Sequence, residues 1–334
     1  MTLHAQATID SRPLRREDRE PPQPKPGEIL VRVAACGICR TDLHVIEGDL
    51  PLHRTPIVPG HQVVGRVERV GDGATRFRIG DRVGIAWLRM TCGRCAFCVS
   101  GRENLCERAE FTGWDADGGF ADYTVVPEAF AYAIPTVFTD VDAAPLLCAG
   151  IIGYRALKLS GVTGHGKLGI YGFGSSAHVT LQVARARGAD VYVWTRAPAQ
   201  QQFARRLGAA WAGDLDAPAP ERMDGAIIFA PVGDVVPVAL ANLARGGTLA
   251  LAGIYMTPLP PLPYASLFEE RAIRTVTANT RADGAELLEA AAQIPIRPTV
   301  TTFPLDQANE ALQRLKAGAF AGTGVLVTGV ASGI

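Results

Sequence analysis

The pattern of the chain changes near residue 150, and this change limits the folds that the chain can adopt. From Glu28 to Val83, short β-branched runs such as EILVRVAAC and HQVVGRVERVG are separated by Gly and Pro, which predicts a compact β-rich domain. Beyond residue 150, apolar runs such as KLGIYGFG, DVYVWTR and GAIIFAP alternate with Ala-rich helical stretches, of which PVALANLARG is one. Strands that alternate with helices indicate βαβ units and a parallel sheet. We therefore expect an α/β chain with two domains.

The ends of the chain give simpler signals. Residues 11–26, SRPLRREDREPPQPKP, are charged and Pro-rich, which is typical of an exposed connection. Near the C-terminus, LDQANEALQRLKAG has the apolar spacing of a helix, and GTGVLVTG predicts a closing strand. A length of 334 residues fits two domains and a substantial core.

Charge and hydropathy exclude some classes of protein. Lys plus Arg and Asp plus Glu both number 33, so the formal net charge is zero, unlike that of a nucleic-acid binder or a membrane-surface protein. The first ten residues, MTLHAQATID, lack the charge and apolar core of a signal peptide, and no apolar run of about 18 residues occurs. We therefore expect a cytoplasmic protein with no nucleic-acid or membrane partner.

Four cysteines lie close together in CGRCAFCVSGRENLC. Cys92, Cys95, Cys98 and Cys106 follow the spacing C-x2-C-x2-C-x7-C. Four thiolates complete a tetrahedral zinc shell and leave no position for substrate, so we predict a structural zinc in a lobe at residues 88–110. Disulfides fit a reducing compartment poorly, and an iron–sulfur cluster would show a different spacing of the fourth cysteine.

A second group of metal donors is scattered along the chain. Cys39 and Asp42 lie in CGICRTDLH, His61 follows in PGHQVVG, and Cys148 lies in APLLCAGIIGY. A catalytic zinc uses three protein ligands plus water, and Cys2His is one such set, while a carboxylate such as that of Asp42 can orient a ligating imidazole. Taken alone, Cys148 is more typical of a buried core cysteine, and His61 of an ordinary turn histidine.

Taken together, these segments resemble the zinc-dependent alcohol dehydrogenases of the medium-chain dehydrogenase/reductase superfamily. The resemblance covers nearly the whole chain and includes GICRTDLH, PGHQVVGRVERVGDG, GDRVG, the four-cysteine lobe, PLLCAGIIGYRAL and TANTRAD. It implies that Cys39, His61 and Cys148 bind a catalytic zinc, and that Cys36 is a neighbouring core residue. It also implies a GroES-like catalytic domain at residues 1–150, a Rossmann NAD(P)-binding domain at residues 151–280, and a segment at 281–334 that returns to the catalytic domain.

The resemblance also implies roles for individual side chains. Thr41 is expected to contact the substrate oxygen, His44 to end a proton relay, and Arg40 to lie near the cofactor pyrophosphate; Arg40 and His44 are also compatible with plain solvated loop residues. The remaining expected contacts are Leu50, Trp87 and Trp114 with the substrate, and Tyr255, Asn279 and Thr280 with the nicotinamide, for which ordinary loop packing is the alternative.

The cofactor turn is expected in YGFGSSA. Gly172, Gly174 and Ala177 form G-x-G-x-x-A between an apolar strand and a helix, so the pyrophosphate would rest on the helix N-terminus beside Ser175 and Ser176. A plain βα turn is the alternative to this interpretation.

Several positions depart from the family pattern. The strand DVYVW ends in Thr195 and Arg196, where an NAD enzyme carries an acid that holds the ribose hydroxyls. A hydroxyl and a guanidinium are able to bind a 2′-phosphate, so we predict a preference for NADP(H); an exposed Arg196 without a ligand role is the alternative. Gln62 replaces the Glu that usually follows the histidine ligand, and its neutral amide is a weaker ligand for a divalent cation.

The predicted function is a zinc-dependent alcohol dehydrogenase with two zinc ions per chain and NADP, or NAD, as cofactor. It would catalyse reversible hydride transfer between a primary or secondary alcohol and the cofactor, as a homodimer or homotetramer. One alternative is a zinc-free quinone or enoyl reductase of the same superfamily, which would lack the second set of metal donors. The other is a non-enzymatic zinc-binding module.

Overall fold

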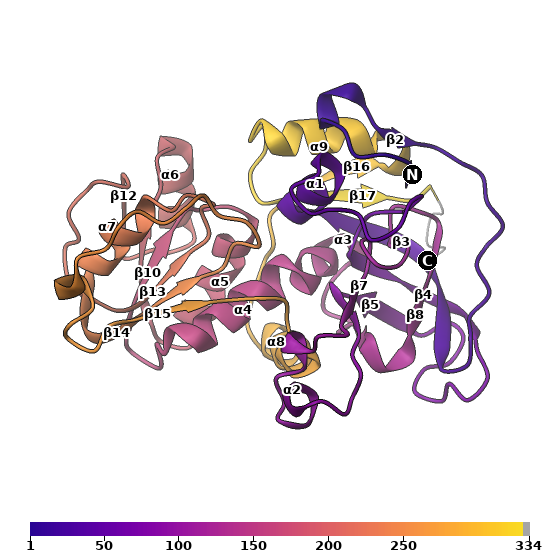
Figure 1. The fold of residues 1–334 in the computed structure, drawn as a ribbon, viewed down its shortest axis with the longest axis horizontal. Helices are drawn as coiled ribbons and strands as arrows, with labels where there is room; N and C mark the ends of the chain where they lie inside the picture. Colours follow the sequence, from indigo (N-terminus) through magenta and orange to yellow (C-terminus); the bar gives the residue numbers. More distant parts are fainter. Residues whose placement is uncertain (330–334) are drawn as a thin grey trace. The chain divides into compact units, whose positions relative to one another are not determined.

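The computed structural model describes residues 1–329, which divide into two compact units (Figure 1). Among the described residues, one unit contains Met1–Cys148, Ala278–Ala292 and residues 297–329, and the other contains Ala149–Thr277 and Gln293–Ile296. Within residues 1–329, no helix combines the length and the apolar character needed to cross a membrane. From the roles expected from the sequence, we call the unit that begins at Met1 the catalytic unit and the unit that begins at Ala149 the nucleotide unit.

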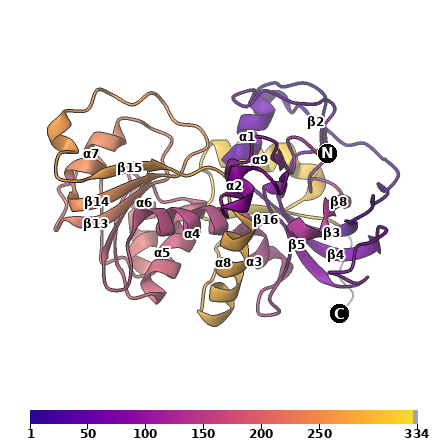
Figure 2. The same ribbon diagram turned by 60° about the horizontal axis from the view of Figure 1, so that its bottom comes forward.

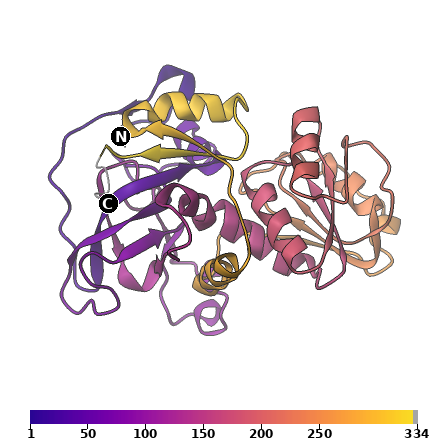
Figure 3. The ribbon, with the colours of Figure 1, turned by 180° about the vertical axis from the view of Figure 1, so that it is seen from behind.

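The catalytic unit is built on a seven-stranded sheet. Its strands run in the order β16-β17-β3-β4-β5-β9, and β8 pairs with β3; β16 and β17 are parallel and the other pairs are antiparallel. Helix α9 (Ala308–Lys316) links β16 to β17 and packs on them (Figure 3). The strands are β3 (Glu28–Ile38), β4 (Gln62–Val70), β5 (Arg82–Ile85), β8 (Tyr123–Pro127), β9 (Ala131–Ala133), β16 (Val300–Pro304) and β17 (Thr323–Val327).

The nucleotide unit contains a six-stranded sheet in which every pair is parallel. The strand order is β12-β11-β10-β13-β14-β15. The chain adds strands outward on one side of β10 and then on the other side, beginning with β13. In this doubly wound arrangement, ligands bind beyond the carboxyl ends of the strands, at the point between β10 and β13 where the order changes sides. Helices α4 and α5 cover one face and α7 the other (Figure 2). The elements are α4 (Ala149–Ser160), β10 (Lys167–Tyr171), α5 (Ser175–Ala186), β11 (Asp190–Trp194), α6 (Pro198–Arg206), β12 (Trp211–Gly213), β13 (Met223–Ile228), α7 (Val235–Ala241), β14 (Leu243–Leu251) and β15 (Ala272–Thr275).

The predicted fold class is confirmed, because a β-rich sheet is followed by a doubly wound parallel sheet. The predicted terminal helix and strand appear as α9 and β17. The stretch PVALANLARG was only partly predicted, because α7 ends at Ala241 and β14 begins at Leu243, whose buried side chain pairs with the start of β13. Helix α8 (Arg281–Gln293) was not predicted.

Candidate active site and structural metal site

The three scattered donors meet at one point of the catalytic unit. Cys39 follows β3 and is the N-cap of α1 (Arg40–Glu47), His61 immediately precedes β4, and Cys148 follows the short helix η4 (Ala144–Leu147). His61 Nε2 lies 3.3 Å from the Sγ atoms of both Cys39 and Cys148. All three ligand atoms lie within 4.8 Å of one another. The predicted set of donors is therefore assembled by the fold.

The carboxylate of Asp42 holds two of the three donors, His61 and Cys39, in place. Its Oδ1 lies 3.2 Å from His61 Nδ1, and its Oδ2 accepts a hydrogen bond of 2.8 Å from the backbone N–H of Cys39. Both side chains are almost completely buried. A carboxylate beside Nδ1 fixes the proton on that nitrogen, so that Nε2 is left to face the two sulfur atoms.

The charges at the site fit a divalent metal. The hydrogen bond from the Cys148 thiol holds the pKa of Cys39 well below its usual value, and the nearby imidazole of His61 acts in the same direction. Burial opposes the charged form of His61, but Asp42 and the Cys39 thiolate outweigh it and raise the pKa of His61 to about 10. Two sulfurs and an imidazole match the Cys2His set of a catalytic zinc, which leaves one coordination position open.

Gln62 lies fully buried in the first position of β4. Its side chain packs against Gly37 of β3, where an added Cβ would lie 3.0 Å from the Gln62 amide carbon. Neither amide atom has a hydrogen-bond partner among the described residues. Buried amides normally have partners, so an orphaned amide next to a metal-ligand segment is consistent with a site completed by a bound group or water.

The residues of α1 have different surroundings. The Thr41 hydroxyl hydrogen-bonds to the Cys39 sulfur and so also lowers the pKa of that thiol. His44 is mostly buried, and its Nδ1 lies 2.7 Å from Asp49 Oδ2, a partner that the sequence analysis did not identify. Arg40 is exposed at the first position of the helix. Thr41, like Asp42 in the same helix, therefore contacts a predicted metal ligand directly.

An aromatic stack extends from the zinc ligands. The edge of the His61 ring meets Trp87 with ring centres 4.9 Å apart, Trp87 stacks on Trp114 at 5.8 Å, and Trp114 stacks on His53 at 4.1 Å. Trp114 Nε1 donates a hydrogen bond of 2.9 Å to the carbonyl of Pro51, next to the half-buried Leu50. The structure thus joins two of the expected substrate residues, Trp87 and Trp114, and places Trp87 beside the predicted zinc ligand His61. His53 had no sequence signal of its own.

The four-cysteine lobe forms the second metal site. The Sγ atoms of Cys92, Cys95, Cys98 and Cys106 lie within 4.8 Å of one another, around the short helix α2 (Ala96–Val99) (Figure 1). The backbone N–H groups of Arg94 and Cys95 point at the Cys92 sulfur and lower the pKa of its thiol to about 6. Four thiol donors match a closed structural zinc site, as predicted.

The cofactor turn lies in the nucleotide unit, between β10 and α5. Gly172 has a φ of +87°, and a side chain there would collide with the backbone of Ala230, so only Gly fits. Gly174 is the N-cap of α5, and Ser175 and Ser176 form its first turn, with the fully buried Ala177 behind them. The N–H groups and the dipole at a helix N-terminus suit a pyrophosphate.

The other expected cofactor residues differ in how far they are exposed to solvent. Thr195 directly follows β11 and is buried, whereas the next residue, Arg196, is exposed. Tyr255 is 45% exposed. Asn279 and Thr280 are buried in the catalytic unit, where Asn279 Nδ2 donates to the Tyr132 hydroxyl over 3.3 Å.

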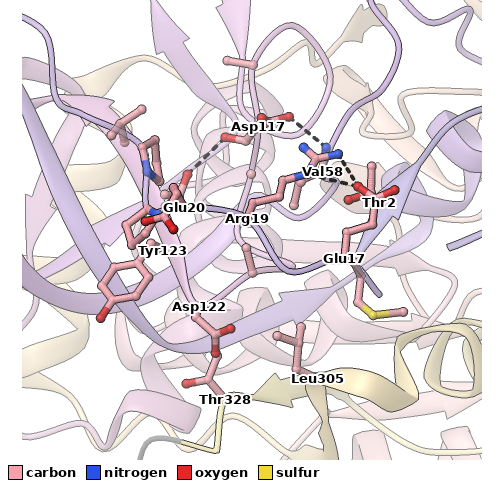
Figure 4. Close-up of a pocket in the computed structure, with 18 of the residues that line it drawn as sticks. Thr2, Glu17, Arg19, Glu20, Val58, Asp117, Asp122, Tyr123, Leu305 and Thr328 are labelled. Carbon is pink, nitrogen blue, oxygen red and sulfur yellow. Dashed lines mark hydrogen bonds and ion pairs between the residues drawn. The ribbon is translucent and has the colours of Figure 1, made fainter. Parts of the chain in front are cut away.

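A large cavity is a separate feature of the catalytic unit. It measures about 1270 Å³, and charged side chains such as Glu17, Arg19, Asp117 and Asp122 line it (Figure 4). None of the described residues that line it is a metal donor of either cysteine group. Ion pairs, including one between Arg54 and Asp117 at 3.7 Å, occupy part of its wall. It is therefore not the candidate active site.

Comparison with known proteins agrees with this geometry. Residues 25–136 match the family model "Alcohol dehydrogenase GroES-like domain", and residues 177–293 match "Zinc-binding dehydrogenase". The chain is 54% identical to the probable alcohol dehydrogenase AdhA of Mycobacterium tuberculosis (strain CDC 1551 / Oshkosh) over 96% of its own length and 94% of that protein. It is 36% identical to an alcohol dehydrogenase of Geobacillus stearothermophilus over 92% of the chain and 93% of that protein.

Solved structures extend the agreement to the fold. A cinnamyl alcohol dehydrogenase of Sorghum bicolor superposes with a TM-score of 0.89 at 29% identity, over 98% of this chain and 97% of that one. Neither the zinc-free reductase nor the non-enzymatic module accounts for both the assembled Cys39–His61–Cys148 group and the similarity along the whole chain. The chain therefore belongs to the zinc-binding alcohol dehydrogenases of the medium-chain dehydrogenase/reductase superfamily.

Proposed function

We propose that the protein catalyses reversible hydride transfer between a primary or secondary alcohol and NAD(P)⁺. The observation that carries this proposal is the approach of exactly three metal donors, Cys39, His61 and Cys148, within 4.8 Å of one another. A tetrahedral ion held by three protein ligands keeps one position for a substrate oxygen. The chemistry supplied by the bound groups is polarisation of that oxygen by zinc and acceptance of hydride by nicotinamide.

The residues around the donors have distinct tasks in this scheme. Asp42 holds the His61 ring so that Nε2 faces the metal position, through contacts of 3.2 Å to His61 and 2.8 Å to the Cys39 backbone. Thr41 lies two residues after Cys39, and its hydroxyl is assigned to receive the proton of the alcohol. His44, held by Asp49 at 2.7 Å, is assigned the outer end of the proton path.

This function is tested by a substrate panel with the purified protein. Alcohols oxidised in the presence of NADP⁺ or NAD⁺ produce the reduced cofactor, which is followed by its absorbance. Replacement of His44 by Ala is expected to slow turnover by about 100-fold without loss of zinc, because proton transfer by a positioned side chain contributes about 100-fold or more. The proposed function would be refuted if a protein that carries two zinc ions per chain failed to oxidise every alcohol in the panel.

For the cofactor, we propose a preference for NADP(H). No acidic side chain stands directly after β11, where Thr195 is buried and Arg196 is exposed, so no carboxylate repels a 2′-phosphate there. An exposed guanidinium beside this strand end is suited to pair with a phosphate. Known structural relatives include both an NADP(H) complex and an NAD complex, so family membership alone does not choose between them.

The preference is tested by the ratio of kcat/KM for NADP⁺ and NAD⁺. Replacement of Arg196 by Ala is expected to lower kcat/KM for NADP⁺ by about tenfold and to leave that for NAD⁺ unchanged, since only the phosphate loses a partner. Arg222→Ala is the control, because Arg222 is also exposed but directly precedes β13, at the amino end of a strand. A wild-type preference for NAD⁺ would refute this assignment.

For the substrate, we propose longer aliphatic and aromatic alcohols. The stacked rings of Trp87 and Trp114 give a flat apolar wall beside His61, and Leu50 stands where relatives that prefer the smallest alcohols often carry an aromatic ring. Trp114→Ala is expected to raise KM for an aromatic alcohol more than KM for ethanol, because only the aromatic ring stacks on the indole. An equal change in KM for the aromatic alcohol and for ethanol would argue against a substrate contact with the Trp87 and Trp114 rings.

We further propose a homodimer or homotetramer. Strand β15 is the last strand of its sheet, and the loop before it carries the exposed side chains of Tyr264 and Phe268, which are 76% and 68% exposed and in contact with each other. Open strand edges and exposed aromatic pairs are features of association surfaces. Light scattering after gel filtration tests this, and a monomer at micromolar concentration would refute it.

A further inference from the structure

The cysteine lobe is clamped to the start of α8 by one ion pair. Glu103 lies between Cys98 and Cys106 and is only 7% exposed. Its carboxylate accepts hydrogen bonds from the Arg281 backbone N–H at 2.8 Å, from Nε at 3.1 Å and from Nη2 at 2.7 Å. The Arg281 guanidinium also lies 4.7 Å from the centre of the Phe130 ring. Figures 1 and 2 show α2 of the lobe beside α8.

The residues just before Arg281 are held with equal precision. Thr280 and Asp283 are joined by reciprocal hydrogen bonds of 2.8–3.1 Å, and Asn279 Nδ2 donates to the Tyr132 hydroxyl. Ala278 adopts a φ of +47°, a conformation that residues other than Gly rarely adopt. Such a backbone persists only where its surroundings hold it in place. The chain passes from the nucleotide unit to the catalytic unit at this point, between Thr277 and Ala278.

We propose that the cysteine lobe has a positioning role in cofactor binding, in which Glu103, through Arg281, fixes the Asn279–Thr280 segment against the nicotinamide. This inference rests on the proposed function, in which Asn279 and Thr280 contact that ring. Four donor–acceptor contacts from one buried carboxylate to one arginine are more than a surface ion pair provides, and they reach the residue adjacent to Thr280. The four-cysteine lobe thus supplies a fixed base for the Asn279–Thr280 segment.

A purely structural clamp makes a different prediction from a positioning clamp. A structural clamp affects the melting temperature alone, whereas a positioning clamp also affects the dissociation constant of the cofactor. An interaction that is made equally in the ground state and in the transition state changes KM and leaves kcat unaltered. Cofactor affinity is therefore the decisive readout.

The experiment compares wild-type protein with Glu103→Gln, Arg281→Gln and the double variant. NADPH and NADH dissociation constants are measured by fluorescence titration, and zinc per chain is measured on the same samples. Each single variant is expected to bind the preferred cofactor about tenfold more weakly while it keeps two zinc ions, and kcat at saturating cofactor is expected to stay within about twofold of wild type. The double variant should bind no more weakly than either single variant, because both remove the same contact.

Glu28→Gln serves as the matched control. Glu28 forms a similarly buried ion pair with Arg89 at 3.3 Å in the same unit, and this pair does not contact the 278–281 segment. The Glu28→Gln variant should therefore bind the cofactor as tightly as wild type. Normal cofactor affinity in Arg281→Gln would overturn the inference, even if Glu103→Gln lost the lobe zinc. If wild-type protein bound neither cofactor, the proposed function itself would fail.

Discussion

The two sulfur-rich centres of this protein are built in opposite ways. The lobe takes all four donors from residues 92–106, and backbone N–H groups of the same loop point at its sulfurs. The catalytic centre takes three donors from the ends of separate elements, buries His61 almost completely, and relies on the carboxylate of Asp42. A local loop is sufficient to close a metal site, whereas a site with an open position requires the whole sheet of the catalytic unit to place its donors.

This contrast predicts that the two centres fail differently. Loss of a lobe donor removes binding energy that is also folding energy, because the loop has little other structure. Loss of support at the catalytic centre leaves a folded protein, since its donors flank the ends of β3, β4 and η4, which form without the metal. The predictions below test this difference, from the largest expected effect to the smallest.

Replacement of Cys98 by Ser should have the largest effect on stability. The lobe would lose its zinc, and the melting temperature measured by circular dichroism should fall by about 10 °C or more. Ser100→Ala is the control, because Ser100 lies in the same loop and its hydroxyl bonds only to neighbours in that loop, donating to the Phe97 carbonyl and accepting from Arg102 Nε. A Cys98→Ser protein that melts like wild type would show that the lobe does not depend on its metal.

Replacement of Asp42 by Asn should weaken only the catalytic centre. Loss of the carboxylate that orients His61 is expected to lower zinc affinity there by about 10- to 100-fold, while the lobe, which has no such carboxylate, keeps its metal. Dialysis against a chelator followed by metal analysis measures the difference. Asp49→Asn, which affects His44 and no zinc ligand, should retain both ions. Loss of both ions from Asp42→Asn would mean that the two centres are not independent.

The smallest effect concerns the clamp between the lobe and α8. Burial opposes the charged form of Glu103, but the contacts with Arg281 outweigh it and lower the pKa of the carboxyl below its usual value of about 4.5. A lowered acid pKa stabilises the folded state at pH values above the unfolded pKa, and this stability is lost as the pH falls through the lower, folded pKa. Glu103→Gln should therefore lower the melting temperature by about 2 °C at pH 7.

The same reasoning fixes the pH dependence of that effect. The difference between wild type and Glu103→Gln should shrink as the pH falls below about 4.5, where the wild-type carboxyl becomes protonated. Thermal unfolding at several pH values between 3.5 and 7 measures it. A difference that stayed constant over this range would show that the charge of Glu103 contributes nothing to the clamp.

The contrast between the centres also explains what the sequence could reveal. The lobe is visible from spacing alone, since its four donors are local and a tetrahedral shell needs no distant partner. The doubly wound sheet is visible from the alternation of strands and helices. Cys148, in contrast, lies in an apolar run, and only the resemblance to a known family joined it to Cys39 and His61.

Other features depend on contacts between distant segments and had no local signal. His53 stacks on Trp114, and Glu103 binds Arg281, but neither pair is close in sequence. The register of α7 and β14 likewise depended on the pairing of Leu243 with Met223. Helix α8, in contrast, was missed although its N-terminus carries a capping box: the Thr280 hydroxyl accepts from the Asp283 N–H and the Asp283 carboxylate accepts from the Thr280 N–H. Its sequence, RADGAELLEAAAQ, also includes a Gly, which weakens the helical signal.

The most direct test of the account is the zinc content and turnover of Cys148→Ser. Cys148 is the donor that stands alone in the sequence and completes the open set. The account predicts a folded protein with one zinc ion per chain, held by the lobe, and alcohol oxidation reduced by about a thousandfold or more. Wild-type turnover in this variant, or an active wild-type protein with a single zinc ion in the lobe, would contradict it.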